Sequence, residues 1–203
     1  MLEPKRLIVL ASLLFNAVIM AGITAWLFNT DSVLAKPKVR SQTPEPLCEH
    51  TLCRPPQTIR LMKSDGSVFE SSFDVENPIV HKGWISIFPG ETLFVEVDRD
   101  KNRLVNLRAV KQMRDPNRTL ELRFWQEKGK PDMFLKVNNP FPKPMKYHAV
   151  MVLLDSDKLY KTSSCPVLAG KIAFERWPHA VFELLLFDFH LVEDGASKSV
   201  CEF

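Results

Sequence analysis

The chain has 203 residues, of which 45% are hydrophobic and 25% are charged, and its formal net charge is +3. This is the composition of a globular protein, and a charge this small without a clustered basic face excludes a nucleic-acid-binding surface. With 7 glycines against 15 prolines, the chain is also a poor candidate for a glycine-rich phosphate-binding loop, and it favours many turns and strand edges.

The first element along the chain is an apolar segment, residues 7–28, that contains no charged residue. About 20 apolar residues are needed to cross the hydrocarbon core of a membrane. Lys5 and Arg6 precede the segment, which favours a cytoplasmic N-terminus. The sequence therefore predicts a single-pass inner-membrane protein, with residues 7–28 as a transmembrane signal anchor and the remaining chain in the periplasm.

A cleaved signal peptide is the alternative interpretation of the same segment. Small residues in Val33-Leu34-Ala35 suit a signal peptidase, and cleavage there would release the domain into the periplasm. Signal peptides usually have a hydrophobic region of about 7–15 residues. The run at 7–28 is longer, which favours retention in the membrane.

A proline-rich stretch follows the apolar segment and predicts an extended linker, residues 29–57, ahead of a folded domain, residues 58–203. The linker prolines stand among polar and basic residues, a composition that cannot build a core. They are Pro37, Pro44, Pro46, Pro55 and Pro56.

Alternation of apolar and polar residues predicts half-buried strands in the folded domain. It occurs in residues 93–98, 105–109, 120–125 and 133–138. Turn-forming residues separate the apolar runs, as in Ser64-Asp65-Gly66-Ser67. With no helical periodicity between the strands, the pattern predicts an immunoglobulin-like antiparallel β-sandwich.

Two runs, residues 147–154 and 181–192, are apolar on both faces and predict covered central strands. The second run is long enough to form a helix. Its Phe and Val content, and Pro178 just before it, favour a strand.

The four cysteines follow the apolar segment, and an exported domain lies where disulfides persist. We expect the pairs Cys48–Cys53 and Cys165–Cys201, the second of which would hold the C-terminal tail. The alternative is a metal or redox site at Cys48, His50 and Cys53, since thiolate and imidazole suit zinc or copper. A structural zinc site needs four ligands, and an oxidising compartment favours the disulfide.

A hairpin around residues 128–131 predicts a surface patch. If Leu120, Leu122 and Phe124 point inward together with their counterparts on the second strand, the intervening residues of both strands lie together on the opposite face. That face then carries the candidate interaction patch of Arg123, Trp125, Phe134 and Lys136. Trp and Arg are enriched at interface hot spots, although a cross-strand aromatic pair also serves only to stabilise a hairpin.

No catalytic constellation and no cofactor-binding motif is recognisable, and the histidines lack spaced partners. The sequence therefore favours a non-enzymatic, membrane-tethered interaction or accessory module of the cell envelope, with an envelope protein as its partner and no cofactor. The alternative function is metal handling or redox chemistry at the Cys48, His50 and Cys53 cluster.

Overall fold

The computed structural model describes residues 48–154, 156, 158–192 and 201, which belong to the second of the chain's two compact units, residues 42–203. The predicted membrane segment, the signal-peptide alternative and most of the predicted linker lie outside the described residues. In the described part, no helix is long and apolar enough to cross a membrane.

The regular secondary structure of the described residues consists of strands only. In chain order these are β1 (Cys53–Arg54), β2 (Gln57–Met62), β3 (Val68–Phe73), β4 (Asn77–Pro78), β5 (Val80–His81), β6 (Trp84–Ile87), β7 (Thr92–Asp100), β8 (Arg103–Val110), β9 (Thr119–Gln126), β10 (Met133–Asn138), β11 (Met145–Leu153), β12 (Leu159–Thr162), β13 (Ile172–Trp177) and β14 (Val181–Leu191). The first of them begins five residues before Thr58, where the sequence placed the start of the folded part.

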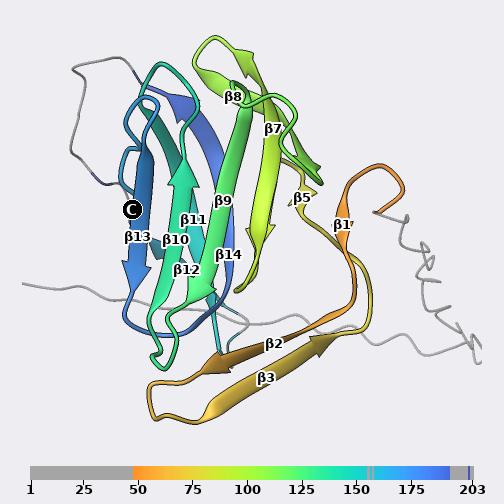
Figure 1. Cartoon of the computed structure of the whole chain (residues 1–203), viewed down its shortest axis with the longest axis vertical. Coiled ribbons are helices and arrows are strands. Elements are labelled where there is room, and N and C mark those ends of the chain that lie inside the picture. The colour runs from red at the N-terminus through yellow and green to blue at the C-terminus, as the bar shows by residue number, and fades with distance from the viewer. Residues whose placement is uncertain (1–47, 155, 157, 193–200, 202–203) are drawn as a thin grey trace, which may run out of the picture. The chain divides into compact units, whose positions relative to one another are not determined.

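The described strands are antiparallel and are consistent with a β-sandwich. One layer has the order β13-β10-β9-β7-β8, and the other contains β12, β11, β14, β6 and β5. Figure 1 shows β13, β10, β9 and β7 in front of β11 and β14. A single residue pair, His190 with Arg103, joins β14 to β8, so the two layers belong to one folded-over sheet.

Alternation places the core between the layers, as predicted for most strands. Leu122, Phe124 and Leu135 are fully buried, while their chain neighbours are at least partly exposed. The apolar run at 181–192 is confirmed as a strand, β14. The turn at 64–67 is also confirmed, because Lys63 N–H donates to Ser67 O at 2.8 Å and closes the β2–β3 hairpin.

The β2–β3 hairpin forms a separate two-stranded sheet that runs across the lower end of the sandwich in Figure 1. Ile59 and Leu61 of β2 are buried. The centroid of the Phe73 ring of β3 lies 5.0 Å from the ring centroid of Phe88 and 5.7 Å from that of Phe182. The hairpin therefore closes one end of the core with aromatic side chains.

The alternation predicted for residues 105–109 is present in β8, where Val105, Leu107 and Ala109 are partly buried while Asn106 and Arg108 are exposed. The fully buried residue of this strand is Leu104, which lies outside the predicted run. Asn106 has a φ of 52°, in the left-handed region, and the register with β7 shifts here. Such a β-bulge adds one residue and reverses the alternation on either side of it.

Candidate functional site

The outer surface of the β9–β10 hairpin carries the four residues of the predicted patch. Trp125 lies opposite Phe134 and Arg123 lies opposite Lys136. The rings of Trp125 and Phe134 are stacked, with centroids 5.6 Å apart and an interplanar angle of 17°. The guanidinium carbon of Arg123 is 5.1 Å from the Trp125 centroid, within range of a cation–π interaction. The hairpin and its register are therefore as predicted.

The adjacent strand β13 extends this surface with two residues that the sequence analysis did not single out. Phe174 pairs with Lys136, and its ring meets that of Trp125 edge to face at a centroid distance of 6.5 Å. Phe174 is 64% exposed and Ile172 is 49% exposed. The sequence of β13 does not alternate between apolar and polar residues, and its pairing with β10 could not be predicted because the two strands are far apart along the chain.

We call this surface the aromatic face; it consists of Arg123, Trp125, Phe134, Lys136, Ile172 and Phe174. Ion pairs border it. Lys136 Nζ lies 2.7 Å from Glu121 Oε1, and Arg176 pairs with the buried Asp132. An apolar, aromatic centre within a charged rim is the arrangement typical of protein interfaces.

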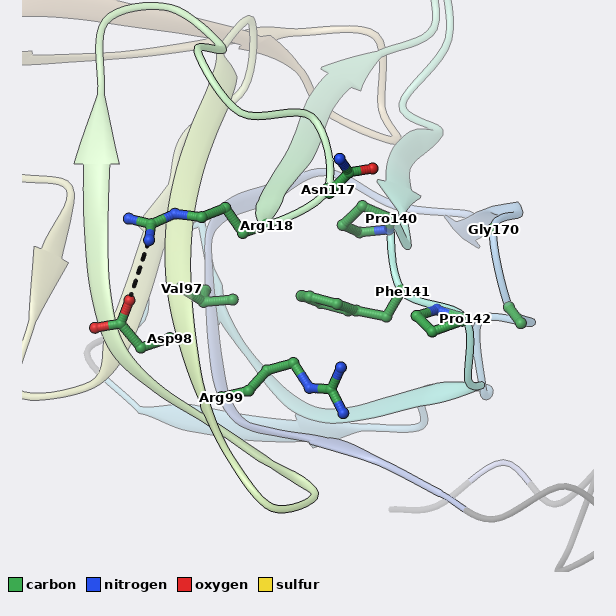
Figure 2. A pocket seen from close by; sticks show the side chains of 10 residues that line it. Val97, Asp98, Arg99, Asn117, Arg118, Pro140, Phe141, Pro142 and Gly170 are labelled. Carbon is green, nitrogen blue, oxygen red and sulfur yellow. Dashed lines mark ion pairs between the residues drawn. The ribbon is translucent and has the colours of Figure 1, made fainter.

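A second candidate site is an open depression of about 710 Å³ at one end of the sandwich. In Figure 2 the Phe141 ring points toward Val97, with Arg118 above it and Arg99 below it. Arg118 forms ion pairs with acidic neighbours: its guanidinium lies 2.9 Å from the carboxylate of Glu96 and 3.5 Å from that of Asp98.

Acidic and basic groups balance around this depression. The side chains of Arg108 and Asn106 hydrogen-bond to the carboxylate of Asp98 and lower its pKa from 3.8 to about 2. Asp98 is therefore ionised at neutral pH and neutralises the neighbouring guanidinium groups. The depression has no concentrated charge of either sign to select a ligand.

Asn139 fixes the loop that carries Phe141. Its side chain is fully buried, and its Nδ2 donates to the carbonyls of Lys143, Val167 and Leu168 at 2.9–3.1 Å. Its Oδ1 accepts from Phe141 N–H at 3.0 Å. One amide thus joins two loops, which explains a polar side chain in the core.

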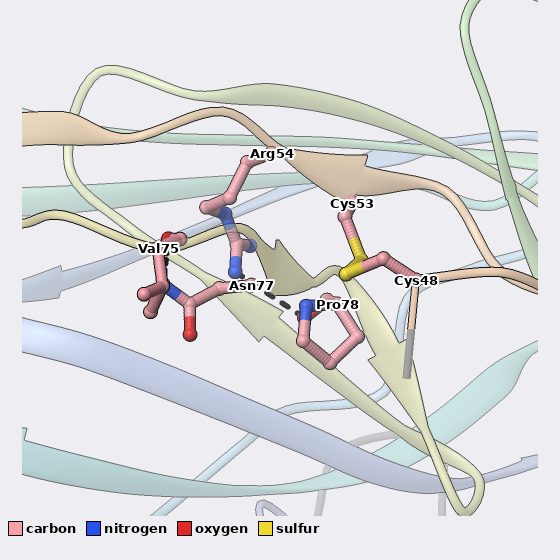
Figure 3. Close-up of a disulfide and its surroundings, with 6 residues drawn as sticks. All are labelled: Cys48, Cys53, Arg54, Val75, Asn77 and Pro78. Carbon is pink, nitrogen blue, oxygen red and sulfur yellow. Dashed lines mark hydrogen bonds between the residues drawn. A yellow bond between two sulfur atoms is a disulfide. The ribbon is translucent and has the colours of Figure 1, made fainter. Parts of the chain in front are cut away.

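The disulfide Cys48–Cys53, which the sequence favoured over a metal cluster, is present in the structure. Cys48 and Cys53 are bonded (Figure 3), so neither sulfur is a free thiolate ligand. His50 is an exposed residue between them in the chain. No group of three or more His, Cys, Asp or Glu residues in the described ranges is arranged to hold a metal ion.

The residue after this disulfide, Arg54, is a buried anchor that the sequence analysis did not identify. Its Nε donates to Glu91 Oε1 at 2.6 Å, and its guanidinium also donates to the carbonyls of Ser86 and Pro78. Figure 3 shows the Arg54 side chain directed toward Pro78. The guanidinium carbon lies 4.6 Å from the Phe88 centroid. The network attaches β1 to the sandwich.

The second disulfide joins Cys165 to Cys201, as expected. Cys165 N–H donates to the carboxylate of Glu175 at 3.0 Å. Burial raises the pKa of Glu175, and the hydrogen bond from Cys165 opposes this shift. The disulfide therefore links Cys201, near the end of the chain, to the loop beside β13.

A β-bulge in β14 gathers His148, Asp188 and His190 on the outer surface of the other layer. Asp188 has a φ of 52°, and its carboxylate lies 3.7 Å from His148 Nε2 and 3.9 Å from His190 Nδ1. Arg103 also lies 3.8 Å from it. Nothing in the sequence pattern marks this bulge, because it depends on the pairing of β14 with β11. All four side chains are partly exposed, which is typical of a surface ion cluster.

The comparisons with known proteins give no relative. No protein-family model, no curated protein and no solved structure shows significant similarity to this chain.

Proposed function

We propose that this chain is a non-enzymatic interaction module of the cell envelope, which recognises an envelope protein through its aromatic face. The observation that carries the proposal is the contiguous ring cluster of Trp125, Phe134 and Phe174, in which Phe174 is 64% exposed and the other two rings are half-buried on the outer surface of β9 and β10. Exposed apolar patches with a polar rim mark binding sites, and Trp, Tyr and Arg dominate the energetics of interfaces.

The proposal includes the location and the finer fold. Residues 7–28 hold the chain in the inner membrane, with the N-terminus in the cytoplasm and the domain in the periplasm. The disulfides of the domain support an oxidising location. The two antiparallel layers support an immunoglobulin-like sandwich.

The location is tested by fusing reporters after Phe203. A reporter that is active only in the periplasm should be active, and one that is active only in the cytoplasm should be silent. The reverse result would refute the topology. Mass spectrometry of the N-terminus of the mature chain distinguishes a retained anchor from cleavage after Ala35.

Partner recognition is tested with the double variant Trp125→Ala/Phe134→Ala in the full-length chain. We expect loss of the cross-linked envelope partners that the parent recovers from native membranes, with a melting temperature only a few degrees lower. The matched control is Trp84→Ala, because Trp84 is an exposed tryptophan that, like Trp125, is stacked on a phenylalanine ring, that of Phe187 in the other layer. Unchanged recovery by the double variant, or equal loss by the control, would refute the proposal.

A further inference from the structure

The free edge of β13 is defined by its hydrogen bonding with β10. Asn139 N–H donates to Lys171 O at 3.0 Å, so Asn139 and Lys171, which come just before the pair of Asn138 and Ile172, are a hydrogen-bonded pair. Bonded and non-bonded pairs alternate in an antiparallel ladder. The backbone groups of Ile172, Phe174 and Arg176 therefore point away from β10. No backbone partner for these groups occurs among the described residues.

This edge lacks a proline and a bulge, two of the features that usually prevent strand pairing, although the loop that carries Cys165 contacts the inward-pointing Glu175 beside it. Monomeric proteins protect edge strands with proline, bulges or covering loops. β13 contains no proline, its register with β10 is unbroken over all six residues, and its outward side chains include exposed Ile172 and Phe174. The edge therefore presents both unpaired backbone groups and apolar side chains.

We propose that a second copy of this chain pairs with this edge, so that the two β13 strands lie antiparallel about a two-fold axis through Phe174. This inference rests on the proposed function and deepens it, because it names one partner of the aromatic face. The result is a continuous sheet that joins the β13-β10-β9-β7 layers of the two copies.

The register of the pairing follows from the direction of the backbone groups. A hydrogen-bonded pair requires both residues to point their groups toward the other strand, which only the even-numbered residues of β13 do. With Phe174 opposite its own counterpart, Ile172 of one copy faces Arg176 of the other. All three outward-pointing residues of each copy are then satisfied.

The side chains are compatible with this register. Glu175 of one copy faces Ala173 of the other, and Arg176 faces Ile172, so no like charges are opposed. Arg176 keeps its ion pair with Asp132 while its alkyl part covers Ile172. The two Phe174 rings meet at the axis and join the Trp125 and Phe134 rings of both copies. The pairing thus covers the most exposed apolar residues of β13.

The decisive variant is Phe174→Pro in the full-length chain purified in mild detergent. Proline removes an N–H that points away from β10, so the ladder within one copy is kept while the pairing between copies is broken. Analytical ultracentrifugation should show a dimer for the parent and a dimer dissociation constant at least about tenfold higher for the variant.

The matched control is Val68→Pro. Val68 is 60% exposed, and the bond from Lys63 N–H to Ser67 O sets the alternation of the β2–β3 ladder so that the Val68 N–H points away from β2. The Val68→Pro variant should therefore leave the dimer intact. A monomeric parent at tens of micromolar, or a dimer that survives Phe174→Pro, would overturn the inference; the second result would also identify a different dimer contact.

A covalent test locates the axis. Phe174→Cys places two sulfurs on directly opposed residues about 5.5 Å apart in Cα positions, a spacing that a disulfide can bridge. A disulfide-linked dimer is expected on non-reducing gels from intact cells, and none is expected from Val68→Cys. Absence of the cross-link despite dimerisation would refute the register. If the parent does not dimerise but the double variant at Trp125 and Phe134 loses its envelope partners, the dimer is refuted and the proposed function is supported. If the parent dimerises but the double variant keeps its envelope partners, the proposed function is refuted and the dimer is supported.

Discussion

The guanidinium of Arg54 and the carboxylate of Glu91 meet at 2.6 Å with side-chain exposures of only 4% and 14%. Glu91 also accepts from the N–H of Phe88 at 2.8 Å, at the turn that leads into β7. The pair therefore connects the segment after the first disulfide to the start of the front layer. Breaking a buried ion pair leaves one charge uncompensated, so its two members depend on each other.

Arg54→Ala should lower the free energy of unfolding by about 3–5 kcal/mol, since it leaves Glu91 without its main partner. Denaturant titration followed by Trp fluorescence measures the change. The control is Arg60→Ala, which removes an exposed pair with Glu70 and should cost about 1 kcal/mol or less. Equal losses in both variants would show that the buried pair has no special role.

Glu183→Gln should alter the pH dependence of stability. Burial raises the pKa of Glu183 above its ordinary value of 4.5, and the hydrogen bond from Ser86 opposes the shift. The folded state therefore holds this proton more tightly than the unfolded state does. The stabilisation is complete below pH 4.5 and is lost as the pH rises through the folded-state pKa.

The parent should accordingly lose more stability than Glu183→Gln between pH 4 and pH 7, because the amide cannot ionise. Melting temperatures across this range measure the difference. Glu70→Gln, on the exposed side of β3, is the control and should follow the parent. A parallel decline in the parent and in Glu183→Gln would contradict the assignment.

Asn139→Ala should destabilise the chain by about 2–4 kcal/mol, because it leaves the carbonyls of Val167 and Leu168 and the N–H of Phe141 without this partner. Asn77→Ala removes a single exposed amide bond to Val75 O and should have little effect. Thermal unfolding compares the two. Similar melting temperatures would mean that the loops do not need the Asn139 amide.

The two disulfides should contribute unequally. Cys165–Cys201 closes a loop with a sequence separation of 36 residues, against 5 for Cys48–Cys53. Chain entropy predicts a loss of about 4 kcal/mol for the double variant Cys165→Ala/Cys201→Ala and about 2 kcal/mol for Cys48→Ala/Cys53→Ala. Denaturation of both variants measures the order, and non-reducing peptide mapping of the parent checks the pairing. The reverse order would rule out loop length as the main source of the stabilisation.

Local sequence patterns predicted much of the fold. The alternation in β9 and β10 predicted which side chains are buried, and the Ser64–Ser67 turn predicted a hairpin that the structure contains. The register across residues 128–131 followed as well, because a one-residue slip would expose the core side of both strands. The contact between Trp125 and Phe134 could therefore be predicted before the structure was known.

Other features depended on partners distant in sequence. The bulges at Asn106 and Asp188 reverse the alternation only because neighbouring strands fix the register on both sides. Arg54 has no pattern that marks it as buried, since its partners come from the turns and strands between Pro78 and Glu91. An arginine is placed in a core only when such partners converge on it.

The sequence by itself determined that this chain forms antiparallel strands with one buried face, and it indicated the disulfide pairs and four of the six residues of the aromatic face. Periodicity and turn chemistry are local, so they can be read from neighbouring residues. Only the tertiary structure decided that β13 lies beside β10 and adds Phe174 to Trp125 and Phe134. Pairing of distant strands depends on which edges remain free after the whole sheet has assembled, and no local pattern encodes that choice.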